Sequence, residues 1–256
     1  MLSKLPHFIR NINPEIYLEY PYTVLDFEIA GGRERGHWRC PENRLILACW
    51  KTVYADPASK QHAEYKVHWG SEFDLGELAH DISRSKFIVA HNAKFELGWL
   101  SRCGVETRKV LPYCTMLGEY VLAGNRQWAL SLDATSLRYG GSGKRDFVAE
   151  SIKGGVDPDD IPRSLLEEYC LKDVKDTDEI FIQQVRRLAD DDLLRVAFAR
   201  NIVCPVLADI ETQGMVLEHG RVILQADSIR DEYKRARDAL DTITGGINPR
   251  SSKQLS

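Results

Sequence analysis

The stretch that decides the fold is YTVLDFE, residues 22–28, a run of β-branched and aromatic residues that ends in two acids. This composition predicts a β-strand. Because alternate residues of a strand share a face, Val24, Asp26 and Glu28 point to one side. Phe27, between the acids, points to the other side. Two neighbouring carboxylates on so apolar a strand repel each other and resist desolvation.

The acid pair has two interpretations. A bound divalent cation would remove both costs, and carboxylate oxygens suit Mg²⁺ or Mn²⁺. Alternatively, the strand end emerges into solvent and both acids remain hydrated.

Working outward, hydrophobic periodicity and turn residues predict the other elements. Strands are expected at 22–28, 45–54, 64–69 and 86–90, and helices at 73–82, 93–104, 114–124, 163–187, 190–213 and 218–243. The polar, glycine-marked stretch 140–162 is expected to be mostly loop, with at most one short helix. A meander of strands followed by alternating helices and strands predicts an α/β fold with a mixed sheet.

Composition narrows the class of protein. The 256 residues allow one large domain, or one domain and part of another. Apolar residues make up 43%, which excludes a disordered chain. The 34 basic and 38 acidic residues, a net charge of −4, exclude a generally basic nucleic-acid coat but not a local basic groove.

Neither the cysteines nor the apolar runs indicate secretion. The six cysteines form no C-x-x-C pair and no zinc spacing with histidine, so we expect buried thiols in a reducing compartment. The N-terminus lacks a signal-peptide pattern, and no window approaches 18 apolar residues. We therefore expect a soluble protein of the cytoplasm, with no membrane partner.

Further acids fall on the predicted helix 163–187. Tyr169 and Asp173 lie four residues apart and so share a face. Asp173 falls on the apolar stripe, where a metal ligand, a cap or an internal salt bridge would explain it. Asp176, Asp178 and Glu179 fall largely off the stripe, which predicts a solvated face.

The stretch HNAKFELGWL, residues 91–100, opens a helix. Asn92 is expected as its N-cap. Glu96 stands one turn in, either as a metal ligand or as an acid that the helix dipole favours near an N-terminus.

The order of these motifs resembles that of the DEDDy group of 3′→5′ exonucleases. LDFE, HNAKFE and YCLKD stand for its three motifs, and the resemblance covers roughly residues 20–187. It implies a ribonuclease H-like fold, with a mixed five-stranded sheet flanked by helices. It also implies two bound Mg²⁺ or Mn²⁺ ions, one held by Asp26, Glu28 and Asp173 and a second facing Asp26 and Glu96. Tyr169 would orient the attacking water alongside Glu28.

Within family A DNA polymerases, the long loop after the first strand and the NRLILACW strand look most like phage or prophage members. The C-terminal part is similar to the segment that follows the proofreading domain in this family. The similar stretches are ARNIVCPVLADIETQGMVLEHGRVIL (199–224) and INPRSSKQLS (247–256). The resemblance implies an exonuclease domain at 1–187 and an incomplete, helical thumb segment at 188–256. The rest of the polymerase would belong to the same native chain or to a second chain, in the bacterial host cytoplasm if phage-encoded. Two plain amphipathic helices are the alternative for 188–243.

Two departures from the family bear on activity. The family usually has Asp where this chain has Glu96, and the added methylene could displace a metal contact by about 1 Å. Family members often carry D-T-M where this chain has Cys114-Thr115-Met116. Either change could weaken the activity.

Candidate contacts to a single-stranded DNA 3′ end come from three places. Phe27 and Asn92 lie within the motifs themselves. Arginine beside an aromatic ring suits single strands, with charge on the phosphates and a ring against a base. On that basis we expect contacts from Arg33, Arg35, Trp38 and Arg39 in one loop and from Lys144 and Arg145 in another. Mobile, charged surface loops are the alternative.

Three functions therefore compete. The first is a metal-dependent 3′→5′ DNA exonuclease that serves proofreading. The second is an RNA-trimming exonuclease of the same fold. The third is a catalytically impaired module that binds a DNA 3′ end.

Overall fold

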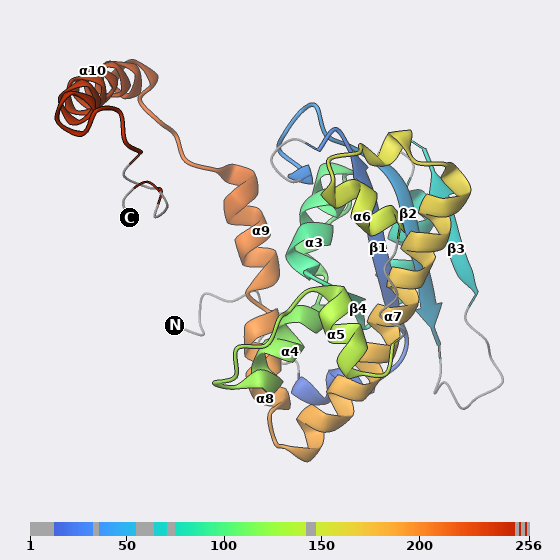
Figure 1. The fold of residues 1–256 in the computed structure, drawn as a ribbon. Coiled ribbons are helices and arrows are strands. Elements are labelled where there is room, and N and C mark those ends of the chain that lie inside the picture. The colour runs from blue at the N-terminus through green and yellow to red at the C-terminus, as the bar shows by residue number, and fades with distance from the viewer. Residues whose placement is uncertain are drawn as a thin grey trace. The chain divides into compact units, whose positions relative to one another are not determined.

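The computed structural model describes residues 13–32, 36–54, 64–70, 75–141 and 147–248, together with 251 and 254. It divides into two compact units, Met1–Thr212 and Gln213–Ser256 (Figure 1). In chain order, the elements are η2 (Pro14–Leu18), β1 (Tyr22–Ala30), β2 (Arg44–Val53), β3 (Tyr65–Trp69), α2 (Gly76–Arg84), β4 (Phe87–Ala90), α3 (Ala93–Arg102), η4 (Thr107–Lys109), β5 (Pro112–Cys114), α4 (Thr115–Ala123), α5 (Leu132–Arg138), α6 (Phe147–Lys153), η5 (Pro158–Asp160), α7 (Arg163–Asp190), α8 (Leu194–Asn201), α9 (Cys204–Gln213) and α10 (His219–Thr244).

A five-stranded mixed sheet forms the centre of the first unit. The strand order is β3-β2-β1-β4-β5. β1, β2 and β3 pair antiparallel, whereas β4 and β5 continue parallel to β1. This confirms the predicted mixed sheet and its four predicted strands. β5 was not assigned from the sequence because its three residues, Pro112–Cys114, are too few to show a period.

Helices cover both faces of this sheet. Val24 of β1 packs in a cluster with residues of α7, including Leu166 and Phe181. Leu25 and Phe27 point to the opposite face. There they pack in a second cluster with α2 and α3. The predicted alternation along β1 is thus confirmed, and Asp26 and Glu28 continue the face that α7 covers.

The long helix α7 follows the predicted stripe. Leu166, Val174 and Phe181 are all buried at the sheet. Full burial of each such side chain contributes about 1.5–3 kcal/mol. The helix thereby holds its other inward residues firmly against β1 and β2.

The prediction that Asp178 lies on a solvated face of α7 is wrong. Its side chain is buried, accepts a hydrogen bond of 2.9 Å from the Tyr22 hydroxyl and forms an ion pair with Lys51. Strands β1 and β2 supply these partners from distant parts of the chain. A buried charge is tolerated once it is paired in this way.

The first unit extends past residue 187, where a boundary was expected, because α8 and α9 pack on it. Phe198 joins the cluster on the α7 face, and Ala208 joins the cluster on the α3 face. The single helix predicted at 190–213 is two helices, separated at residues 202–203. Pro205 explains the break, since proline lacks an N–H and is tolerated only in the first turn of a helix.

The second unit is dominated by α10. It agrees with the helix predicted at 218–243, and it ends at Gly245 in the left-handed conformation. Large apolar side chains such as Ile229 and Tyr233 are exposed along it. Within the part of the chain that the structure describes, no helix has the length and apolar composition needed to cross a membrane.

Candidate active site

The candidate site begins with the acid pair of β1. Glu28 is 8% exposed and Asp26 is half-buried. In the ladder with β2, Asp26 lies opposite Cys49 and Glu28 opposite Leu47. The register shifts immediately after Glu28, which marks a β-bulge. Bulges bend a strand and redirect its side chains, and β1 stays paired with β2 through Ala30.

Helix α7 brings a third acid and a phenol to the same place. Asp173 is 6% exposed and receives a hydrogen bond from Tyr169, one turn earlier on the helix. Burial raises the pKa of Glu28 well above its usual range, and the neighbouring charges of Asp26 and Asp173 add to this rise. The predicted convergence of β1 and α7 is present.

A cysteine that the sequence reading passed over also faces the acids. The Cys170 Sγ lies 3.6 Å from Asp26 Oδ2. Asp26, Glu28 and Cys170 each offer one potential ligand atom, and these atoms lie within 4.8 Å of one another. The signal was available, since Cys170 lies on the stripe that also carries Asp173 and Val174, at helical spacings of three and four.

Electrostatics make this cluster costly without a counter-ion. Burial raises the pKa of Asp26 to about 7. Burial raises the pKa of Asp173 too, and the Asp26 charge adds to it. Burial, followed by the charge of Asp173, also raises the pKa of Tyr169, which therefore stays protonated and can act as a hydrogen-bond donor.

Glu96 approaches the cluster from α3. It lies in the first turn, is 3% exposed, and its Oε2 has no hydrogen-bond partner among the described residues. Burial, with a contribution from the Asp26 charge, raises its pKa well above the usual range. Its oxygens do not belong to the group of atoms within 4.8 Å. Glu96 is thus a neighbour of Asp26 with an unsatisfied oxygen, one step outside the tightest group.

The turn before α3 has an unusual backbone. Asn92 occupies the predicted N-cap position, but its φ is +67° and its side chain makes no capping hydrogen bond. A left-handed non-glycine residue is strained and requires support from its surroundings. His91 supplies some of it, through a 2.8 Å hydrogen bond with Thr115 Oγ1 and a 2.9 Å bond to the Leu130 carbonyl. Burial lowers the pKa of His91 to about 4, so the ring is neutral.

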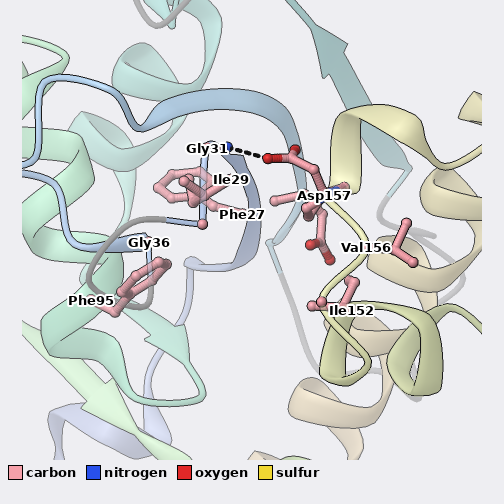
Figure 2. A pocket seen from close by; sticks show the side chains of 12 residues that line it. Phe27, Ile29, Gly31, Gly36, Phe95, Ile152, Val156 and Asp157 are labelled. Atoms are coloured by element: carbon pink, nitrogen blue, oxygen red, sulfur yellow. Dashed lines mark hydrogen bonds between the residues drawn. The ribbon is translucent and has the colours of Figure 1, made fainter.

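A cavity of about 630 Å³ adjoins the acid pair. Figure 2 shows Phe95 on one side and Val156 and Asp157 on the other. Asp157 accepts a 2.8 Å hydrogen bond from the Gly31 N–H, which joins the segment after β1 to the segment after α6. The full lining is Phe27, Glu28, Ile29, Gly31, Gly32, Gly36, Phe95, Ile152, Gly155, Val156, Asp157 and Pro158. Phe27 therefore borders this space, although its ring is largely buried.

The structure contradicts the predicted DNA contact at Trp38. The ring is 4% exposed, and its Nε1 donates a 2.9 Å hydrogen bond to Thr212 Oγ1. It packs so closely on α3 that a Cβ added at Gly98 would lie 2.2 Å from it. Its neighbour Arg39 donates a 3.3 Å hydrogen bond to the Glu211 carbonyl. The predicted contacts at Arg33, Arg35, Lys144 and Arg145 lie outside the described residues.

The residues present fit a divalent cation. Carboxylates on β1 and α7 converge, and a buried oxygen of Glu96 has no partner among the described residues. Hard oxygen ligands of this kind suit Mg²⁺ or Mn²⁺. Asp26, Glu28 and Asp173 would hold such an ion.

The sheet order and the helices on both faces define a ribonuclease H-like α/β fold, and two solved structures share this architecture. One, described as the apo form of a nuclease, is 17% identical with a TM-score of 0.54. The other is Brucella melitensis NrnC with bound Mg²⁺, at 19% identity and a TM-score of 0.50. Each similarity covers 79% of this chain and 90% of the other. No protein-family model and no curated protein matches the sequence.

Proposed function

We propose that this chain is a metal-dependent 3′→5′ exonuclease that removes nucleoside 5′-monophosphates from single-stranded or frayed DNA. The observation that carries the proposal is the convergence of Asp26, Glu28 and Asp173, whose pKa values are all raised. Two similar folds belong to a nuclease and to an NrnC with bound Mg²⁺, which supports the same reaction class.

Each residue has a role in this reaction. Bound Mg²⁺ or Mn²⁺, two ions in this proposal, would lower the pKa of a water and neutralise charge on the phosphate. Asp26, Glu28 and Asp173 would hold one ion, and Glu96 would hold the second directly or through water. The Tyr169 hydroxyl, kept protonated, orients the attacking water. Water adds to the terminal phosphorus, and the bond to the leaving 3′-oxygen breaks.

The cavity beside Glu28 suits the terminal nucleotide. Its walls include the rings of Phe27 and Phe95, which offer an apolar surface to a base. Asn92, in the strained turn before α3, would also contact the single-stranded DNA. Base contact at Phe95 is a role that the sequence did not suggest.

The second unit bears on the cellular role. We propose that Gln213–Ser256 belongs to the thumb of a family A polymerase of a phage, so that the exonuclease serves proofreading in DNA replication. The support is the sequence resemblance at 199–224 and 247–256. Co-purification with a polymerase module, in the same native chain or a second one, would test this proposal.

Digestion of a 5′-labelled single-stranded DNA in Mg²⁺ tests the activity itself. The expected product is a ladder that shortens from the 3′ end, lost on chelation of the metal and in Asp26→Ala. Glu179→Gln is the matched control, because Glu179 is an exposed acid on α7. An Asp26→Ala protein that digests DNA as fast as the parent would contradict the site.

An RNA-trimming exonuclease is the second candidate, because the same carboxylates and the same fold would serve RNA equally well. Parallel digestion of DNA and RNA oligonucleotides of one sequence separates the two. A strong preference for RNA would reverse our assignment of the substrate.

A catalytically impaired module that binds DNA 3′ ends is the third. The buried and unsatisfied Glu96 oxygen is the observation that favours it. Tight binding of single strands without release of mononucleotides in Mn²⁺ would support impairment. Restored release in Glu96→Asp would identify the extra methylene as its cause.

A further inference from the structure

Cys170 places a thiol among the acidic side chains of the site. Its Sγ lies 3.6 Å from Asp26 Oδ2, and the same distance separates it from the Asp26 carbonyl oxygen. The side chain is fully buried on the α7 stripe that faces β1. With Glu28, the site therefore presents two oxygen atoms and one sulfur atom, all within 4.8 Å of one another.

These distances match a known coordination geometry. With a Zn–S bond of about 2.3 Å and a Zn–O bond of about 2.0 Å, a tetrahedral ion separates the sulfur and oxygen ligands by about 3.5 Å. The Cys170–Asp26 pair already has this separation, at 3.6 Å. The Glu28 oxygen lies within 4.8 Å of both of these atoms, which is at most about 1.3 Å beyond that separation.

A second observation also points to a cation. Glu96 Oε2 is buried and has no hydrogen-bond partner among the described residues. Asp26 is the charge that acts on Glu96 most strongly. A cation bound at Asp26 would thus compensate the charges of Asp26 and Glu96, which repel each other in a buried environment.

We propose that Cys170 is a metal ligand and that, with Asp26 and Glu28, it makes this site selective for a thiophilic divalent cation of the Zn²⁺ class. Binding forms a sulfur–metal bond and breaks the S–H bond, and the proton passes to solvent. No electron is transferred. The inference rests on the proposed function in one respect, namely that the same two acids hold the catalytic ion.

This ligand set has a consequence for metal preference. Mg²⁺ requires near-octahedral oxygen coordination, whereas soft thiolate ligands select cations such as Zn²⁺. A Zn²⁺ ion held by Cys170 would occupy the position of the catalytic Mg²⁺. Micromolar Zn²⁺ is therefore expected to inhibit Mg²⁺-dependent digestion.

Titration of the whole chain with Co²⁺, without nucleic acid, tests the ligand directly. Thiolate ligation produces a sulfur-to-cobalt charge-transfer band in the near ultraviolet. We expect the band in the parent protein and its loss in Cys170→Ser, which keeps a hydrogen-bond donor of similar size beside Asp26. Zn²⁺ affinity should fall by roughly tenfold or more, since even the loss of an outer-shell partner costs 10–100-fold. An equally intense band in Cys170→Ser would overturn the proposal.

Controls separate this inference from the proposed function. Cys103→Ser removes a thiol at the end of α3 and should leave the band unchanged. Co²⁺ binding that depends on Asp26 but shows no charge-transfer band would overturn the role of Cys170 alone. No divalent binding at all would overturn both proposals. If Cys170→Ser does not fold, the ¹¹³Cd resonance of the parent protein decides, because its shift distinguishes one sulfur ligand from none.

Discussion

Two buried carboxylates on α7 lie five residues apart and have opposite surroundings. Asp178 pairs with Lys51 and accepts a hydrogen bond from Tyr22. Asp173 accepts a hydrogen bond from Tyr169 and lies beside the charges of Asp26 and Glu28. The charge of Lys172 also acts on Asp173, but its ammonium forms its ion pair with Asp176. The charge of Asp178 is therefore compensated by an ion pair, whereas the charge of Asp173 is not. A buried acid with a cation of its own is structural, whereas acids that share one space without a cation indicate a site for an external one.

The largest expected effect is the loss of exonuclease activity when Asp173 is replaced by its amide. Asp173→Asn is expected to lower exonuclease activity by about 10³-fold, because bound metal supplies several kcal/mol and each 1.36 kcal/mol is tenfold. Its thermal stability in a chelator should be unchanged or higher, because a repulsive charge is removed. A single-turnover digestion and a melting curve measure the two effects. Retained activity would contradict the assignment of Asp173.

The reverse pattern is expected at the paired acid. Asp178→Ala should destabilise the first unit by about 3–5 kcal/mol, because it leaves Lys51 buried without its counter-charge. Activity per folded molecule should change little. Urea unfolding at neutral pH measures the loss. If Asp178→Ala lost activity at full stability, the division between structural and functional acids would be wrong.

Divalent metal ions should stabilise the protein through the acid cluster that includes Asp173. At about 100 times its Kd, Mg²⁺ or Mn²⁺ adds about 2.7 kcal/mol of stability and should raise Tm by about 5–10 °C. Asp173→Asn should lose most of this shift, and Glu179→Gln should keep it. A shift of the same size in both variants would place the ion elsewhere.

His91 shows a third arrangement, in which a partly buried side chain is held in its neutral form. Burial lowers its pKa to about 4, against about 6.5 in the unfolded chain. Its contribution is complete above pH 6.5, and it is lost as the pH falls toward 4, because only the unfolded chain takes up the proton. Between pH 7.5 and 5 the loss is about 2 kcal/mol. Comparison with His91→Gln separates the contribution of His91 from that of the acids, whose raised pKa values change stability with pH in the opposite direction. Parallel pH profiles of stability in the two proteins would show that His91 makes no such contribution.

Local patterns predicted much of this protein. The period of two along β1 put Asp26 and Glu28 on one face, and the i, i+4 spacing put Tyr169 and Asp173 together on α7. Both are confirmed, because each depends only on the geometry of one regular element. β5 and α5 were not predicted, since three and seven residues carry too little periodicity.

The predictions were wrong for residues whose surroundings are set by partners distant in the sequence. Trp38 has the sequence context of a loop residue, but Gly98 leaves space for its ring against α3. Asp178 lies off the apolar stripe, but Tyr22 and Lys51 provide its hydrogen bond and counter-charge. Partners separated by 60 to more than 150 residues leave no local pattern.

The sequence by itself determined the mixed α/β architecture and which acids are oriented toward one another, because hydrophobic period sets the face of each residue. Only the tertiary structure decided which acids are neutralised. It gave Asp178 an ion pair with Lys51, placed Asp26, Glu28 and Asp173 together without an ion pair among the described residues, and brought Cys170 to the same space. The physical reason is that the pKa and the ligand capacity of a buried group depend on the atoms within a few ångströms of it. Those atoms come from segments that only folding brings together.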